Sequence, residues 1–336
     1  MVTSIRIIAI DVLFSETMHF FLNKTTRIAV KCPFAKVSLI HKHLPRCLTT
    51  VADSELVIDT NDTSILASCD NKILTITLNT PKIYNALTET MGKSFQNLIK
   101  QTIIPALLNE GEGSLQANVM LITGAGNAFS AGGDLNWLRN LRHNPVHINS
   151  GKMYNFYKSF LCIRELPIPV ISVLNGPAIG AGACLAISSD MIISSKKKCK
   201  IGFTFSKLGI HAGMGGSHFL PLRIGYKGIT HEILYSGRIL EGDECLSLGL
   251  VNRLVDDDRL LQEAIVLAKD ISNNNNPLAV RGMLQSLRLK EDNGLEEALR
   301  READQQALCY AKSDWGEGIN ALIDKREPEF ADWFEK

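Results

Sequence analysis

Residues 122–135 read ITGAGNAFSAGGDL, and this stretch decides how the rest of the chain is interpreted. It continues an apolar run that begins at Val119, which is typical of a short buried strand. After Gly124 the glycines stand at 126, 132 and 133, so the segment has neither the GxGxxG spacing of a dinucleotide loop nor a P-loop Gly-Lys-Ser/Thr. It predicts a strand that ends in an exposed turn of small residues, where a ligand can approach backbone N–H groups.

A second turn of the same kind lies about fifty residues further along the chain. Residues 175–190 read NGPAIGAGACLAISSD and follow the apolar run 170–174. The helix that starts within this turn offers unpaired backbone donors. Two such turns on one sheet can aim two N–H groups at a single oxygen, as an oxyanion hole requires. Taken alone, either turn is also explained by strand-to-helix packing, and Asp134 is well placed to cap the helix that begins at Leu135.

Around these turns the chain alternates between strand and helix patterns, which favours an α/β fold with buried strands. From about residue 256 onward the pattern is purely helical. We predict strands at 72–78, 119–122, 170–174 and 191–193, and helices at 88–107, 260–271, 277–289 and 295–312.

The first fifty residues differ in composition from the rest. Residues 1–52 carry seven Lys/Arg and two acids, a net charge of +5, and no acid occurs from Met18 to Ala52. This cationic, hydroxylated composition is typical of a mitochondrial presequence, with a plastid presequence as the alternative, processed near residue 48. A tail without any targeting function is the competing interpretation. We therefore divide the chain into a presequence (1–52), a linker (53–69), a core (70–255) and a C-terminal helical region (256–336).

The overall composition excludes several classes of protein. The 36 basic and 35 acidic residues do not make the broad cationic surface of a nucleic-acid-binding protein. The eight cysteines contain no CxxC pair, so we expect reduced thiols and no metal site. The uncharged run 167–189 is interrupted by prolines and by the Asn175-Gly-Pro break, so we expect no membrane span.

Taken in order, the motifs resemble those of the enoyl-CoA hydratase/isomerase (crotonase) superfamily. The resemblance implies an α/β, crotonase-like spiral of ββα units with a C-terminal helical trimerisation region, giving a homotrimer or a dimer of trimers. It also implies an acyl-CoA thioester as ligand, with no cofactor beyond the coenzyme A part of the substrate. The matching segments are 122–135, 175–190, 207–210, 213–216, 236–238, 249–253 and 317–328.

The resemblance also assigns roles to individual residues. The two oxyanion-hole N–H groups correspond to Gly133 and Ala181, which would stabilise a thioester enolate. The C-terminal lysine that reaches a CoA phosphate corresponds to Lys325, although a lysine on a surface helix needs no function. The remaining positions that would contact CoA are Lys82, Ile83, Ala131, Asp134 and Leu135.

The chain departs from the family pattern where proton transfer is expected. Hydratases of the family use two glutamates, and this chain has Cys184 and Phe205 at those positions, neither of which is a carboxylate. Cys184 as a nucleophile is less favoured than a buried inert thiol. His211 is the titratable residue left in this window, and histidine ordinarily titrates near neutrality. It is therefore a candidate proton carrier, and the simpler alternative is a hydrogen-bonded turn histidine.

Three functions therefore compete. The first is an enzyme of fatty-acid or branched-chain acyl-CoA metabolism that hydrates or isomerises an acyl chain, with ordinary two-glutamate hydration in doubt. The second is a catalytically silent acyl-CoA-binding relative. The third is a structural protein that keeps the assembly and has lost the ligand, which the intact glycine turns argue against.

Overall fold

The computed structural model describes residues 48–51, 55–60, 62–109, 111 and 113–331. Most of the expected presequence lies outside these residues. Within its range the structure describes strand β1, Leu48–Val51, which pairs antiparallel with β2.

The expected linker at 53–69 is wrong. Strand β2 (Glu55–Ile58) and most of strand β3 (Ile65–Asp70) lie in this range and belong to the main sheet. Along β3 the residues alternate between buried and more exposed from Ile65 onward, which is the period-two pattern of a strand with one buried face. The signal was therefore present in the sequence, but six residues with two polar side chains are too few to stand out in a polar segment.

The larger sheet of the described residues has eight strands in the order β1-β2-β3-β4-β5-β6-β8-β11. Its first four strands pair antiparallel, and the pairs from β4–β5 to β8–β11 are parallel. The predicted strands of the core are confirmed, with slightly different ends. The remaining strands of this sheet are β4 (Ile73–Leu78), β5 (Val119–Gly124), β6 (Val170–Leu174), β8 (Met191–Ser195) and β11 (Arg253–Val255).

A second sheet of three short strands runs beside the first, in the order β10-β9-β7. These strands are β7 (Ala178–Ile179), β9 (Lys200–Gly202) and β10 (Ile239–Glu241). The chain passes from β6 to β7 to helix α6 (Ala181–Ile187), and then from β8 to β9 to the short helix η5 (Ser206–Leu208). Each of these two repeats thus adds one strand to the larger sheet, one strand to the smaller sheet and then a helix, which confirms the spiral of ββα units.

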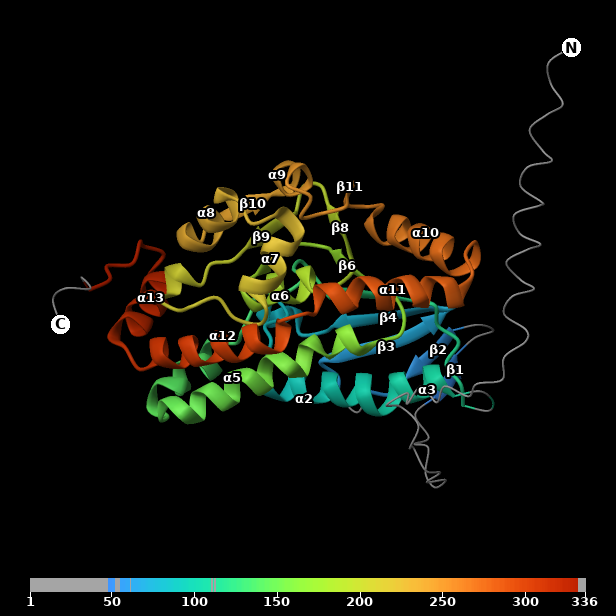
Figure 1. Cartoon of the computed structure of the whole chain (residues 1–336), viewed down its shortest axis with the longest axis horizontal. Coiled ribbons are helices and arrows are strands. Elements are labelled where there is room, and N and C mark those ends of the chain that lie inside the picture. The colour runs from blue at the N-terminus through green and yellow to red at the C-terminus, as the bar shows by residue number, and fades with distance from the viewer. Residues whose placement is uncertain (1–47, 52–54, 61, 110, 112, 332–336) are drawn as a thin grey trace, which may run out of the picture. The chain divides into compact units, whose positions relative to one another are not determined.

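Helices cover both faces of the parallel strands. One face packs against α2 (Glu89–Asn97) and α5 (Val146–Leu161), which lie along the sheet in Figure 1. The other face packs against α10 (Leu260–Asn273), whose buried residues after Leu260 are small. The predicted helix 88–107 is continuous, but between α2 and α3 (Ile104–Leu108) it contains a π-helical segment, Leu98–Ile103. This wider segment leads into Pro105, which has no N–H to donate.

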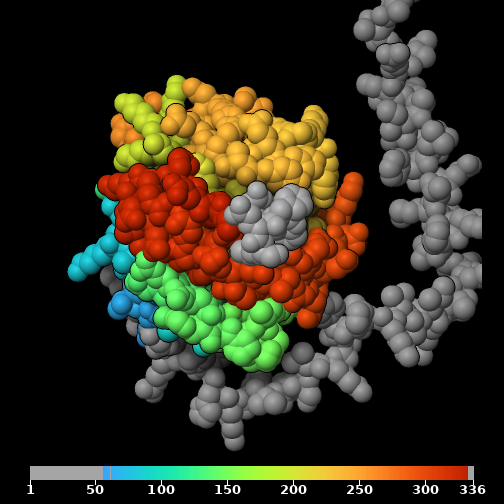
Figure 2. Space-filling model, turned by 90° about the vertical axis from the view of Figure 1, so that its left-hand side faces the viewer, coloured from blue at the N-terminus to red at the C-terminus, as the bar shows by residue number. Residues whose placement is uncertain are grey.

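The C-terminal helices return to the core. Helices α11 (Pro277–Glu291), α12 (Leu295–Tyr310) and α13 (Ser313–Asp324) follow α10. The sequence predicts α10, α11 and α12 but not α13. Helix α12 packs along α5, and α13 packs against η5. Figure 2 shows the red C-terminal residues between green residues of α5 and the yellow-orange residues of α8 (Gly228–Ser236) and α9 (Gly242–Ser247). No described helix is long and apolar enough to cross a membrane.

Candidate active site at the two glycine-rich turns

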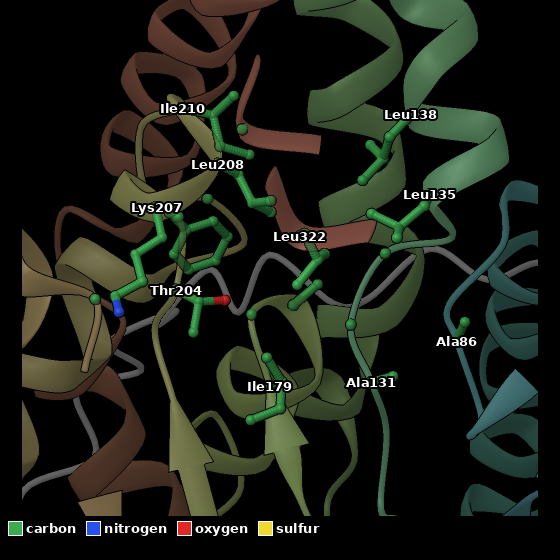
Figure 3. A pocket seen from close by; sticks show the side chains of 18 of the residues that line it. Ala86, Ala131, Leu135, Leu138, Ile179, Thr204, Lys207, Leu208, Ile210 and Leu322 are labelled. Carbon is green, nitrogen blue, oxygen red and sulfur yellow. The ribbon is translucent and has the colours of Figure 1, made fainter. Parts of the chain in front are cut away.

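A cavity of about 920 Å³ lies where the two glycine-rich turns meet the C-terminal helices. Its walls come from the turns, from α5 and η5, and from α12 and α13, and most of the lining groups are apolar. Figure 3 shows Leu322 of α13 pointing into the space beside Leu208 and Leu135. The cavity therefore combines segments that are up to about 240 residues apart in the sequence.

In the first glycine turn, a backbone donor that faces the cavity is free. The Leu87 N–H donates to the Gly132 carbonyl at 2.7 Å, and the Asp134 N–H donates to the Leu87 carbonyl at 3.0 Å. Between them, the Gly133 N–H has no acceptor among the described residues, and Gly133 lines the cavity. Asp134 accepts a hydrogen bond from the Trp137 N–H at 2.7 Å, which confirms its predicted role as the cap of α4 (Leu135–Asn140).

The second turn places another free donor beside the first. Ile179 N–H donates to the Ser130 carbonyl at 2.9 Å, which joins the two turns directly. Ala181 is the first residue of α6, and its N–H likewise has no acceptor within the described part of the chain. A Cβ on Gly132, whose φ is +95°, would lie 3.4 Å from the Ala181 nitrogen. The two free N–H groups are thus carried by adjoining segments of one cavity wall.

The positions of the two family glutamates are apolar here. Cys184 lies one turn into α6 and is fully buried, and burial raises the pKa of its thiol well above the ordinary range. This burial fits the expected inert thiol better than a nucleophile. Phe205 lines the cavity directly and is largely buried. Neither position supplies a carboxylate to the cavity.

His211 does not occupy the position that the proton-carrier hypothesis needs. It is absent from the cavity lining that the described residues form, whereas its neighbours Ile210 and Gly213 belong to it. Its Nδ1 lies 2.6 Å from the Ala212 carbonyl oxygen, so the simpler alternative of a hydrogen-bonded turn histidine fits the geometry. We therefore do not carry His211 forward as a catalytic residue. His218, on α7 (Gly216–Ile224), lies with its Nε2 2.7 Å from the Glu291 carbonyl oxygen and does not line the cavity either.

In the otherwise apolar part of the cavity wall, helices α5 and α12 contribute a group of hydrogen-bonded polar side chains. The hydroxyls of Tyr157 and Tyr310 donate to Gln306 Oε1 at 2.7 and 2.9 Å. All three side chains are buried and line the cavity, and burial raises the pKa of both phenols. The sequence analysis did not identify Gln306 and Tyr310 as residues of the cavity. Their four-residue spacing on α12 was the available signal, but it did not show which way that face points.

The mouth of the cavity carries positive charge. Lys207 and Lys325 line it and form no ion pair with another described residue. Arg238 is held by Glu232 and Glu244, whereas Arg326 is held by Glu317. The guanidinium of Arg326 lowers the pKa of the Glu317 carboxyl to about 2. Two lysines are therefore free to meet an anionic ligand.

Of the residues that the resemblance assigned to CoA, most are brought together here. Lys82 is the exception, since it lies in the short helix η1 (Pro81–Ile83) and does not line the cavity. Among the described residues, no cluster of three His, Cys, Asp or Glu side chains is arranged to hold a metal ion. The assigned residues that do line the cavity are Ile83, Ala131, Gly133, Asp134, Leu135, Ala181 and Lys325.

Known proteins share this sequence and this fold. Residues 68–333 match the family model "Enoyl-CoA hydratase/isomerase". The 1,2-epoxyphenylacetyl-CoA isomerase of Escherichia coli (strain K12) is 31% identical over 268 residues, covering 79% of this chain and 97% of that protein. The crotonyl-CoA hydratase of Syntrophomonas wolfei subsp. wolfei is also 31% identical, covering 80% of this chain and 97% of that protein.

A solved structure leads to the same assignment. The enoyl-CoA hydratase/isomerase of Pseudoalteromonas atlantica T6c superposes with a TM-score of 0.67 at 27% identity, covering 80% of this chain and 100% of the other. The family-model match, residues 68–333, includes both glycine turns and the C-terminal helices α10 to α13. Because sequence, fold and the paired turns agree over this whole length, the chain belongs to the enoyl-CoA hydratase/isomerase (crotonase) family.

Proposed function

We propose that this protein binds an acyl-CoA thioester and stabilises its enolate with the N–H groups of Gly133 and Ala181. The observation that carries the proposal is the pair of free amides on adjoining turns of one cavity. Backbone donors fixed in a cavity with few polar groups are effective at stabilising negative charge on a thioester oxygen. The names of two relatives, a 1,2-epoxyphenylacetyl-CoA isomerase and a crotonyl-CoA hydratase, are consistent with this role.

The same cavity argues against ordinary hydration with two glutamates. Water addition needs a group that removes a proton and another that supplies one, and positions 184 and 205 offer a buried thiol and a phenyl ring. An oxyanion hole alone still contributes on the order of 10²–10³ in rate. We therefore favour an enzyme of acyl-CoA metabolism with unusual proton transfer. A catalytically silent acyl-CoA-binding protein is the second candidate, and the apolar residues at 184 and 205 favour it.

Coenzyme A would enter through the charged mouth, and we expect no other cofactor. The free ammonium groups of Lys207 and Lys325 support phosphate binding there. Ala131, Asp134 and Leu135 lie on the neighbouring turn, where the family resemblance places the adenine.

Replacing Ala181 by proline tests the oxyanion hole. Proline removes the N–H but is well accepted at the first position of a helix, which Ala181 occupies in α6. We expect turnover of crotonyl-CoA by the purified protein to fall by about 10²–10³, while calorimetric binding of CoA itself is unchanged. Gly228→Pro, at the first position of α8, is the matched control because it lies outside the cavity.

The outcomes separate the three functions. Turnover in the parent protein that Ala181→Pro abolishes supports the enzyme. Binding of both CoA and crotonyl-CoA without turnover supports the silent binding protein. If neither ligand binds the parent protein, the acyl-CoA assignment is rejected and a structural role remains.

We propose in addition that the protein forms a homotrimer or a dimer of trimers through its C-terminal helical region. Large apolar side chains are exposed on α11, which supports a buried interface in an assembly. Light scattering coupled to gel filtration tests the mass of the particle, and a monomer would reject the proposal. The side chains concerned are Leu278, Met283, Leu287 and Leu289.

We also propose a mitochondrial location, with a plastid as the alternative. The basis is the net charge of +5 and the scarcity of acids in residues 1–52. A fluorescent protein fused after residue 52 should enter the organelle, and diffuse fluorescence in the cytosol would contradict the proposal.

A further inference from the structure

The segment from Ile210 to Ser217, called the loop below, consists of the connection between η5 and α7 and the first two residues of α7, and it forms one wall of the cavity. Ile210, Gly213 and Met214 line the cavity from this loop. Met214 has a φ of +56°, a left-handed conformation that is uncommon for a residue with a side chain. Contacts outside the loop must therefore hold it in this shape.

Glu302 of α12 holds the end of this loop. Its Oε2 accepts the Gly215 N–H at 2.7 Å, and its Oε1 accepts the Ser217 N–H at 2.8 Å and the Ser217 hydroxyl at 2.6 Å. The helix that starts here, α7, has no side-chain cap of its own at Gly215. A carboxylate from another helix thus satisfies the free donors and complements the positive end of the helix dipole. Glu302 is completely buried and does not line the cavity.

Gln306, one turn further along α12, holds the beginning of the loop. Its Nε2 donates to the His211 carbonyl at 2.6 Å. Its Oε1 accepts the hydroxyls of Tyr157 and Tyr310, so the same amide fixes two phenols of the cavity wall. Gly213 lies against this group, since a Cβ there would stand 2.5 Å from the Tyr157 hydroxyl oxygen. The loop is therefore fastened at both ends by one face of α12.

We propose that Glu302 and Gln306 are positioning residues that hold the loop Ile210–Ser217 as the wall of the acyl part of the cavity, so that they set the affinity for the acyl chain. The inference rests on the proposed binding of acyl-CoA. The inference distinguishes the acyl part of the cavity from its mouth. At the mouth, Asp134 directly precedes α4 and Lys325 directly follows α13, so neither residue belongs to this loop. Loss of either fastening should weaken binding of the acyl chain and leave binding of CoA unchanged.

The test compares two ligands on matched variants. Calorimetry gives Kd for CoA and for butyryl-CoA, a saturated thioester, with the full chain and with Glu302→Gln and Gln306→Leu. Each variant loses hydrogen bonds of the fastening, so we expect the ratio of the two affinities to fall about tenfold. Glu297→Gln and Gln305→Leu are matched controls because both positions are exposed on the same helix, and they should keep the parent ratio.

A milder variant covers the case in which a buried substitution prevents folding. Ser217→Ala removes the hydroxyl that donates to Glu302 and keeps the backbone bond. It should lower the ratio by a smaller factor, and its effect should not add fully to that of Glu302→Gln, since both act on one contact.

Two results would overturn the inference. The first is a folded Ser217→Ala or Glu302→Gln protein that binds butyryl-CoA and CoA in the parent ratio, because the contact would then serve stability alone. The second is an equal loss for both ligands, which would place the effect at the mouth. A parent protein that binds CoA but gains nothing from the butyryl group rejects this inference alone, whereas a parent protein that binds neither ligand rejects the proposed function and this inference with it.

Discussion

Asn85 links two segments of the active-site region, the loop before α2 and the first glycine turn. Its Oδ1 accepts the Thr80 N–H at 2.9 Å, and its Nδ2 donates to the carbonyls of Ala125 and Ala128 at 2.9 and 2.8 Å. Its own carbonyl accepts the Ser130 hydroxyl. Asn85 is fully buried and has a φ of +55°, a conformation that asparagine tolerates better than most residues. It thereby fixes the loop before α2 onto the first glycine turn.

We expect Asn85→Ala to reduce the free energy of unfolding by about 3 kcal/mol, because it leaves several buried backbone groups without partners. Urea denaturation followed by circular dichroism measures the change. Asn79→Ala is the control, since the Asn79 side chain makes one hydrogen bond, to the Thr63 carbonyl, at the surface. Equal effects of the two substitutions would contradict the linking role of Asn85.

Glu302 makes the stability of the protein depend on pH. Burial is the largest influence and raises the pKa of its carboxyl from 4.5 to about 7, although the hydrogen bonds from Ser217 and Gly215 act in the opposite direction. The charges and titratable groups around it are Arg301 on its own helix, Tyr157 of α5 and Cys184 of α6. Between pH 4.5 and about 7 the folded protein therefore keeps a proton that the unfolded chain has lost.

This proton makes the contribution of Glu302 to the free energy of unfolding fall as the pH rises through that window. The difference between a pKa of 4.5 and one of about 7 corresponds to about 3 kcal/mol. The contribution should be level below pH 4.5 and above pH 7. Denaturation curves across the window, for the parent protein and for Glu302→Gln, measure it as a difference. The same slope in both proteins would show that another group is responsible.

At the scale of elements, a buried ion pair attaches α11 to the parallel sheet. Arg288 donates to both oxygens of Asp190, at 3.0 and 2.6 Å, and to the carbonyls of Arg164 and Leu166. Asp190 in turn accepts the Val170 N–H at the start of β6. Arg164 lies within 3.5 Å of the same carboxylate. Helix α11 is therefore held to the sheet by charge as well as by apolar contacts.

Removing one partner of such a pair leaves a buried charge, which is more costly than removing both. We expect Arg288→Met to lower the free energy of unfolding by about 3 kcal/mol, and Arg288→Met combined with Asp190→Asn to cost less than the sum of the single changes. Thermal and urea unfolding measure both. Lys290→Met, at an exposed position of the same helix, should have little effect. Strict additivity of the two changes would show that the pair is not coupled.

At the scale of the whole molecule, the cavity depends on the close contact of α13 with η5. A Cβ on Gly318 would lie 2.5 Å from the carbonyl carbon of Leu208, so glycine is required where the two backbones meet. Leu322, one turn further along α13, lines the cavity. The position of the C-terminal helix therefore sets the shape of a cavity whose two glycine turns lie about 190 and 140 residues earlier in the chain.

Gly318→Ala should lower the melting temperature and weaken binding of butyryl-CoA, because the clash is with backbone that cannot rotate away. Gly316→Ala is the matched control on the same helix, where a Cβ meets no atom within 4 Å. Alanine favours the helix by about 1 kcal/mol over glycine, so the control should raise the melting temperature. A Gly318→Ala protein that is also stabilised would mean that α13 does not pack on η5 in solution.

The sequence by itself determined the order of the elements and the family. The apolar runs at 119–122 and 170–174 became buried parallel strands, and the two glycine turns after them carry the free N–H groups. Such features are local, because burial on both faces demands a continuous apolar run and a close turn demands glycine. Cys184 and Phe205 were also visible from the sequence, so the proposal that the two family glutamates are missing needed no coordinates.

Only the tertiary structure decided which side chains meet in the cavity. In the sequence, Gln306 and Tyr310 are ordinary helix positions, and they line the cavity only because α12 packs along α5. His211 is a candidate in the sequence, but in the structure it is not part of the cavity lining. The register of β3 was likewise settled by its pairing with β4, and that of β2 by its pairing with β3, rather than by their own short patterns. Contacts between residues distant in the chain depend on helix packing and strand register, and the local periodicity of a sequence does not reveal either of them.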